Sequence, residues 1–264
     1  MTQVGMKWNA ADYANNASAQ YAWAQSLITQ LNLSGNENVL DIGCGDGRIS
    51  AQIAGLVTGP VVGIDSSEQM VREATAKYSD KNGQLIFRQI DATRLSFKEE
   101  FELVFSNAAL HWVSDHCAVL AGIKNALRPA GRAVLSMGGK GNVVDILPVV
   151  NDLIQTPQWH SFFEGFVFPY AFYGDEEYAQ WLPEAGLQAK RIELVPKDMV
   201  HDNAAALKGW IRTTWFPYTG RVPQQCREEF IDELVDNYLA QYPLDADGRT
   251  HVRMIRLEVE AVKV

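Results

Sequence analysis

Three aspartates stand at or near the ends of apolar runs, and a glycine-rich turn follows the first of them. The stretch VLDIGCGDGRIS (39–50) places Asp41 in its apolar run and then three glycines spaced two apart. GIDSS places Asp65 just past a second apolar run, and RQIDAT places Asp91 at the end of a third. A glycine turn between a strand and a helix is typical of a nucleotide site. Because ligands of open α/β sheets bind beyond the carboxyl ends of the strands, the three aspartates indicate one shared ligand site.

The spacing of the glycines disagrees with the dinucleotide fingerprint G-x-G-x-x-G. Counting from Gly43, that fingerprint requires a glycine where this chain has Arg48, which disfavours a nicotinamide-dependent oxidoreductase. Asp41 would oppose a pyrophosphate but suits a ligand that carries an ammonium and a sulfonium group, such as S-adenosylmethionine. Asp65 follows the turn by about 20 residues, where a carboxylate usually binds ribose hydroxyls. Asp91 is then placed to accept a hydrogen bond from the adenine amine.

Alternating strands and helices must bring these side chains together. Strands are predicted at 38–42, 61–64, 85–90, 101–106 and 131–137, and helices at 67–78 and 116–127. This alternation predicts a Rossmann-like, doubly wound α/β fold with a mostly parallel sheet and helices on both faces. Strands at 187–200 and 251–264 extend the expected sheet to seven, and helices are predicted at 204–215 and 228–242.

The regular alternation stops between residues 138 and 186, where aromatic side chains are concentrated. They are Trp159, Phe162, Phe163, Phe166, Phe168, Tyr170, Phe172 and Tyr173. We expect one domain over 1–264 in which 138–186 forms an aromatic-rich lid over the substrate, because apolar pockets commonly lie over such an edge. Ordinary core packing is the alternative for each of these rings.

Composition narrows the choice of partners. Lys and Arg number 23 against 32 Asp and Glu, a formal net charge of −9, which disfavours a nucleic acid. Three cysteines without a CxxC pair indicate a reducing compartment, and we expect a cytoplasmic monomer or homodimer that does not bind membranes. The five histidines form no HxxxH pair, so no metal is expected.

Five segments together resemble a known family. VLDIGCGDG, VVGIDSSEQMV, FRQIDAT, FELVFSNAALHWVSDH and ALRPAGRAVLSM look, in this order and spacing, like a class I S-adenosylmethionine-dependent methyltransferase. Within that class, NAALHWVSDH resembles the trans-aconitate and juvenile-hormone-acid types, which esterify carboxylates of small molecules. The resemblance implies a cofactor site at Gln20, Asp41, Gly43, Cys44, Gly45, Gly47, Asp65, Ser66, Met70, Asp91, Ala92 and Asn107.

The position of residues after the fourth strand or among the aromatic rings adds catalytic and substrate-binding candidates to Gln20, which the resemblance implies. The catalytic candidates are Gln20, His111 and Trp112, and the further substrate candidates are Trp159, Tyr170, Arg212, Trp215 and Tyr218. Gln20 is the residue typical of the juvenile-hormone-acid type, whereas the trans-aconitate type more often has arginine there. His111 is either a base or a structural residue, and Arg212 and Arg221 either bind a substrate carboxylate or form surface ion pairs. We expect His116 to cap the helix that it begins.

The expected reaction is transfer of a methyl group from S-adenosylmethionine to a small molecule by in-line displacement. A carboxylate oxygen is the favoured acceptor, because it is ionised at neutral pH and requires no general base. A hydroxyl, amine or thiol acceptor and an acid carried on a macromolecule remain alternatives. A module that binds the cofactor without turnover is the alternative from another functional class.

Overall fold

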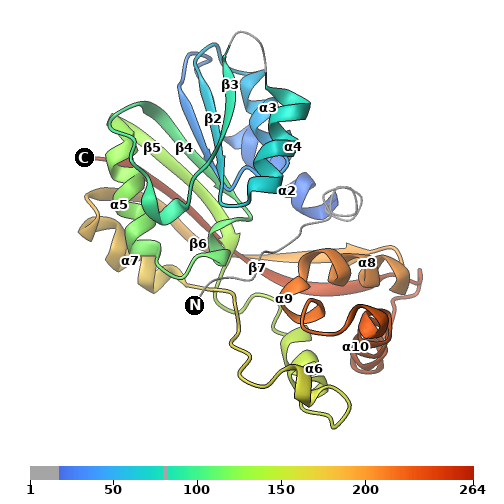
Figure 1. The fold of residues 1–264 in the computed structure, drawn as a ribbon. Coiled ribbons are helices and arrows are strands. Elements are labelled where there is room, and N and C mark those ends of the chain that lie inside the picture. Colours follow the sequence, from blue (N-terminus) through green and yellow to red (C-terminus); the bar gives the residue numbers. More distant parts are fainter. Residues whose placement is uncertain (1–17, 80–82) are drawn as a thin grey trace.

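One twisted sheet organises the molecule (Figure 1). The computed structural model describes residues 18–79 and 83–264, with the side chains of the first helix described from Trp23 onward. In that part of the chain, seven strands lie in the order β3-β2-β1-β4-β5-β7-β6. They are β1 Val39–Ile42, β2 Val61–Asp65, β3 Leu85–Gln89, β4 Phe101–Asn107, β5 Leu127–Gly138, β6 Leu187–His201 and β7 Thr250–Lys263. Only β7 runs antiparallel to its neighbours, so the prediction of a mostly parallel seven-stranded sheet is confirmed.

Helices cover both faces of the sheet because its central strands are apolar on both sides. One core cluster contains Val39, Val61 and Leu103 with residues of α2 (Ser18–Gln30) and α3 (Arg48–Ala54). Another contains Leu40 and Val62 with residues of α5 (His116–Ala126) and α7 (Asp175–Glu184). Alternate residues of a strand point to opposite faces, which explains this division. The α-helices are α2 Ser18–Gln30, α3 Arg48–Ala54, α4 Glu68–Tyr78, α5 His116–Ala126, α6 Ile146–Leu153, α7 Asp175–Glu184, α8 Ala204–Thr214, α9 Phe216–Thr219 and α10 Arg227–Gln241.

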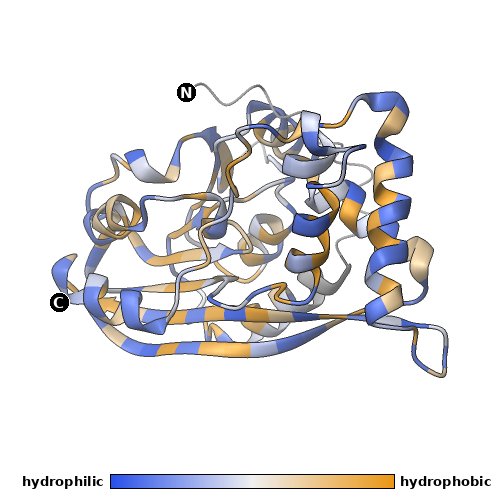
Figure 2. Ribbon diagram, turned by 90° about the horizontal axis from the view of Figure 1, so that it is seen from below, coloured by the Kyte–Doolittle hydropathy of each residue, from blue (hydrophilic) through white to orange (hydrophobic). Residues whose placement is uncertain are grey.

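The last two strands extend well past the rest of the sheet. β6 and β7 pair from Leu187 opposite Lys263 to His201 opposite Thr250, while β5 reaches only as far as Arg256 of β7. The projecting ends form the floor of a second core with α6, α8, α9 and α10. We call residues 143–172 and 199–254 the cap. Figure 2 shows hydrophilic and hydrophobic residues alternating along the two long strands, as expected for a ribbon with one covered face.

The structure divides the predicted aromatic segment 138–186 into two parts. Residues up to Phe172 belong to the cap, whereas α7 packs on the main sheet and buries Tyr178 and Leu182 there. Sequence reasoning missed both α6 and α7. The short α7 buries only those two residues and contains Pro183, so its apolar period is weak.

Different residues cap the N-termini of α4, which follows β2, and α5, which follows β4. Ser67 caps α4 and accepts a hydrogen bond from the Met70 amide. Asp115, not His116, caps α5, so the prediction of a capping role for His116 was wrong. The His116 ring is 1% exposed, with Nδ1 2.7 Å from the Tyr178 hydroxyl and Nε2 2.9 Å from the Leu110 carbonyl. It is therefore a satisfied core residue that ties α5 to α7.

We expect His116→Ala to lower the free energy of unfolding by about 2–4 kcal/mol, because it leaves a cavity and removes both hydrogen bonds. Urea unfolding of the purified protein measures this change. His160→Ala removes an exposed imidazole and serves as the control. Equal stability of the two variants would contradict the tying role of His116.

Candidate functional site

The glycine turn after β1 brings the chain close to the end of β4. Gly43, Gly45 and Gly47 have φ angles of 76°, 54° and 83°, a left-handed conformation that favours glycine. A β-carbon on Gly43 would lie 2.1 Å from the Ala109 β-carbon, so the approach requires glycine. A β-carbon on Gly45 would meet nothing within 4 Å, which leaves open space over the middle of the turn.

Asp65, at the end of β2, faces the same turn. Its Oδ2 accepts a hydrogen bond from the Gly45 amide at 3.1 Å, and its Oδ1 accepts one from the Ser67 amide at 2.8 Å. Burial raises the pKa of this carboxyl group. Ser66 beside it is exposed, and Met70 is buried one turn into α4. The carboxylate is thus fixed in orientation, and each oxygen keeps a lone pair for a ligand hydroxyl.

Asp41 lies beneath the turn, 2% exposed, and accepts a hydrogen bond from the Ser50 hydroxyl at 2.6 Å. Burial, together with the negative charge of Asp65, raises the pKa of Asp41 to about 7. The same surroundings raise the pKa of the buried Cys44 thiol well above its usual range, so this cysteine stays protonated. A cation near Asp41 would favour its ionised form.

Asp91 follows β3 and stands next to Asp65 in the sheet. The Ile90 amide donates to the Asp65 carbonyl at 3.0 Å, and Asp91 begins the short turn Ala92–Arg94. The Asp91 side chain is exposed and accepts from the amide and hydroxyl of Thr93 at 2.9 Å and 2.8 Å. The structure therefore brings the three predicted aspartates to one edge of the sheet.

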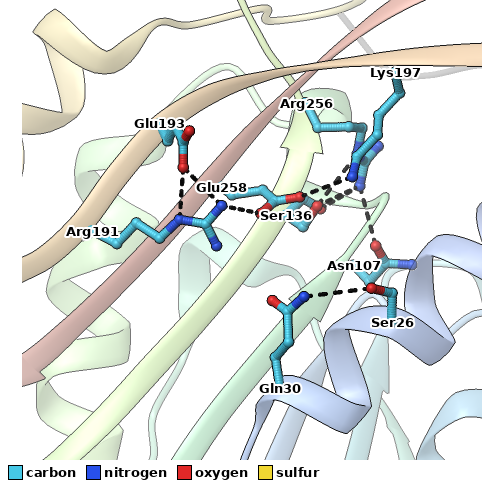
Figure 3. A network of polar contacts seen from close by, with 9 residues as sticks. All are labelled: Ser26, Gln30, Asn107, Ser136, Arg191, Glu193, Lys197, Arg256 and Glu258. Atoms are coloured by element: carbon cyan, nitrogen blue, oxygen red, sulfur yellow. Dashed lines mark hydrogen bonds and ion pairs between the residues drawn. The ribbon is translucent and has the colours of Figure 1, made fainter.

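A buried cation of β7, which sequence reasoning missed, lies at the end of β4. Asn107 Oδ1 accepts a hydrogen bond at 3.1 Å from the guanidinium of Arg256, which is 3% exposed (Figure 3). The same guanidinium donates to the Ser136 carbonyl at 2.8 Å, and it lies 5.9 Å from the Trp23 ring. A signal existed in the sequence, because a long polar residue interrupts the apolar alternation of β7 at this position.

His111 follows β4 at the entrance to the cap. Its Nδ1 accepts a long hydrogen bond of 3.4 Å from the Gly138 amide, and its carbonyl accepts one of 2.8 Å from the Ala171 amide. Burial, with a smaller contribution from the charge of Arg256, lowers the pKa of His111 to about 3. The ring is therefore neutral at physiological pH and is a weak base.

Aromatic rings surround His111. The Trp112 ring stacks on Phe216 at 5.0 Å and lies 4.5 Å from Tyr170, and the Tyr170 and Phe172 rings lie about 6 Å from the imidazole. The Tyr170 hydroxyl donates to the Thr214 carbonyl at 2.9 Å. Trp112 and Tyr170 are half-buried, so this cluster forms a wall between the sheet edge and the cap.

Two residues that were expected to contact the substrate interact with other residues of the protein. The Trp159 ring is 1% exposed, packs edge-on against Phe230 and donates to Glu233, so it belongs to the core of the cap. Arg212 makes a two-pronged ion pair with Glu228 at 3.0 Å and 3.2 Å. α8 and α10 pack against each other, so Arg212 forms the surface ion pair that was one of its two expected roles.

The remaining candidates are buried or lie outside the described side chains. Trp215 is 3% exposed and Tyr218 is fully buried, its hydroxyl without a hydrogen-bond partner among the described residues. Arg221 lies over the Phe166 ring at 5.3 Å. Gln20 falls in α2, but its side chain is outside the described residues.

The parts of the chain that the structure describes contain no group of three or more His, Cys, Asp or Glu side chains arranged to hold a metal ion. No helix within them is long and apolar enough to cross a membrane.

Comparison with known proteins identifies the family. Residues 39–131 match the model of the methyltransferase domain family. The match contains the glycine turn and all three aspartates. Over these residues the chain is an S-adenosylmethionine-dependent methyltransferase domain of the class I type.

The relatives named here match three quarters or more of this methyltransferase. It is 26% identical to the trans-aconitate 2-methyltransferase of Agrobacterium fabrum, over 98% of this chain and 100% of the relative. It is also 26% identical to the juvenile hormone acid O-methyltransferase of Drosophila melanogaster, over 76% and 71% of the two chains. The crystal structure of YcgJ protein from Bacillus subtilis shares the fold, with a TM-score of 0.62 and 19% identity over 92% of this chain and 98% of that one.

The described residues of the methyltransferase fit its cofactor. The open space over Gly45 leaves room for a ligand at the turn, and Asp65 presents oriented oxygens where ribose hydroxyls would lie. Asp41, whose pKa is near neutrality, supplies negative charge for the cationic methionine part. Assignment of the individual contacts remains a prediction.

We expect alanine substitutions at two glycines of the turn to lower the free energy of unfolding by different amounts. Gly45→Ala meets open space but strains the backbone, at a cost of about 1–2 kcal/mol. Gly43→Ala adds a clash with Ala109 to the same strain, so its free energy of unfolding should fall clearly further, by more than about 3 kcal/mol in total. Chemical denaturation of both variants measures the difference. Indistinguishable denaturation midpoints of the two variants would contradict this expectation and show that the turn can move away from β4.

We expect affinity for S-adenosylmethionine to depend on Asp41. The raised pKa means that the ligand-free protein holds a proton that a bound cation would expel, so affinity should rise by up to about tenfold from pH 6 to pH 8. Calorimetric titration in two buffers of different ionisation enthalpy measures the released proton. Asp41→Asn keeps an acceptor for Ser50 and should abolish both effects. Their persistence in that variant would assign the proton to another group.

Proposed function

We propose that this methyltransferase transfers the methyl group of S-adenosylmethionine to a carboxylate oxygen of a small molecule. The carrying observation is the environment of His111: its Nδ1 already accepts a hydrogen bond from the Gly138 amide, and the Tyr170 and Phe172 rings lie about 6 Å from the imidazole. Burial there lowers the pKa of His111 to about 3, so it is a poor proton acceptor at neutral pH. A carboxylate is already ionised and loses no proton on methylation, so it needs no base. A neutral phenol or ammonium group would have to lose one.

The surroundings of His111 support a partly apolar acceptor of limited size. Trp112, Tyr170 and Phe172 present aromatic surface next to the imidazole. Small-molecule sites are mostly apolar clefts with a few polar groups that fix orientation. The hydrogen bond from Ala171 to the His111 carbonyl ties the cap to the end of β4. We propose that the cap segment within residues 138–186 acts as a lid that excludes water during transfer.

The relatives favour the same acceptor class. One is named for trans-aconitate and another for juvenile hormone acid, and both names specify an acid. Gln20 is the residue expected of the juvenile-hormone-acid type, which favours a less strongly anionic substrate than aconitate. These similarities add to the argument from His111 and are independent of it.

The protein contributes alignment and exclusion of water. When bound, the cofactor supplies a methyl group activated by the sulfonium, which bonds to the acceptor oxygen while the C–S electron pair stays on sulfur. The acceptor oxygen, the methyl carbon and the sulfur must lie in one line. Asn107 and the glycine turn define the cofactor side of this line, and Trp112 and Tyr170 define the acceptor side. Such alignment contributes up to roughly 7–11 kcal/mol of barrier reduction.

Incubation with methyl-labelled cofactor and a panel of small carboxylic acids, phenols, amines and thiols tests the proposal. We expect label in methyl esters, recognised by mass and by release in mild alkali. Label found only in ethers, amines or thioethers would refute the carboxylate acceptor. Label found in an acid borne on a carrier protein, with every free acid untouched, would refute the small-molecule part.

Replacement of His111 should separate positioning from base catalysis. For a carboxylate substrate, His111→Gln should lower kcat by less than about tenfold, because no proton is transferred, whereas loss of a general base costs about 10²–10⁴-fold. The kcat of the native enzyme should also stay flat between pH 6 and pH 8. A titrating limb near pH 6.5 that disappears in His111→Gln would contradict this scheme.

A further inference from the structure

The buried guanidinium of Arg256 reaches the point where the cofactor turn and the aromatic wall meet. It donates to Asn107 at 3.1 Å, and to the Ser136 hydroxyl at 3.0 Å. Asn107 ends β4 two residues before Ala109, the residue that packs against Gly43. Gly138, which pairs with Arg256 across β5 and β7, donates to His111 Nδ1 at 3.4 Å, and the charge of Arg256 helps to lower the pKa of His111. One cation therefore influences both the cofactor side and the acceptor side of the site.

A positive region surrounds this guanidinium on the side of α2. Arg191 lies 2.8 Å from both Glu193 and Glu258, and Lys197 lies 3.9 Å from Glu258 (Figure 3). Arg256, Arg191, Lys197 and Glu258 line, with residues of α2, a cavity of about 100 Å³. In contrast, the cofactor side holds the three aspartates, so the two sides of the site differ in the sign of their charge.

We infer that Arg256 determines the charge class of the acceptor and selects an anion, an inference that rests on the proposed transfer to a carboxylate. A guanidinium stays protonated in any folded protein. A sulfonium and a carboxylate together carry no net charge, so a neighbouring cation tolerates that pair and attracts the free acid. A sulfonium with an amine keeps one positive charge throughout, because the new bond moves that charge from sulfur to nitrogen. Arg256 disfavours this second combination.

Affinity measurements with two forms of the cofactor test the charge effect without any acceptor. S-adenosylmethionine carries the sulfonium and S-adenosylhomocysteine does not. Arg256→Gln should raise the ratio of their affinities in favour of S-adenosylmethionine by about 3–10-fold, because a repelling cation is gone. Arg256→Lys keeps the charge and should leave the ratio within about twofold. An unchanged ratio in a folded Arg256→Gln protein would overturn the inference.

Kinetics on the acids that the native enzyme methylates supply the second measurement. Arg256→Gln should raise KM for these acids by about 10–100-fold with kcat nearly unchanged, and Arg256→Lys should recover most of the loss. Arg72→Gln is the control, since it removes an arginine paired with Glu68 on the exposed face of α4. It should change neither KM nor the affinity ratio.

The remaining outcomes are decisive as well. Equal losses in both Arg256 variants, with lowered melting temperatures and no change in the affinity ratio, would make Arg256 a structural anchor and overturn the inference. If no acid is methylated by the native enzyme, the proposed function fails. The affinity ratio still decides in that case whether the charge of Arg256 acts at the sulfonium.

Discussion

The close approach of the glycine turn to the end of β4 is the constraint on which the site depends. Gly43 packs so tightly against Ala109 that no other residue fits, and the parallel register of β1 between β2 and β4 fixes that approach. Asp65 then holds the turn through the Gly45 amide. A strand shifted by one residue would reverse the faces of its side chains and separate these groups. The site is thus a consequence of strand register.

The charge distribution follows from this arrangement. Parallel strands end at one edge, so Asp41 in β1, Asp65 at the end of β2 and Asp91 after β3 gather on the same side. The antiparallel β7 contributes Arg256 from the other direction, and its guanidinium ends beside Asn107. In the proposed reaction, a cationic cofactor and an anionic acceptor would each meet the opposite charge. The neutral His111 stands between the two sides.

The long antiparallel pair of β6 and β7 explains how one sheet can support both the proposed cofactor site and the cap. Its inner half completes the sheet, and its outer half carries the second core, which includes Trp159, Trp215 and Tyr218. Aromatic residues that look available for substrate therefore divide into two groups. Trp112 and Tyr170 lie at the wall beside His111, whereas Trp159 stabilises the cap itself.

The sequence by itself determined the features that are local. The period of the strands, the glycine spacing and the position of each aspartate in or directly after its strand were enough to predict the sheet and the edge at which we propose that the cofactor binds. Tertiary structure decided the roles of His116, Trp159 and Arg256, because each depends on a partner far away in the chain. Asn107 and Arg256 are 149 residues apart, and β7 passes β5 in the reverse direction. No local pattern specifies such a contact, since burial and pairing with a distant strand give the arginine its place and its effect.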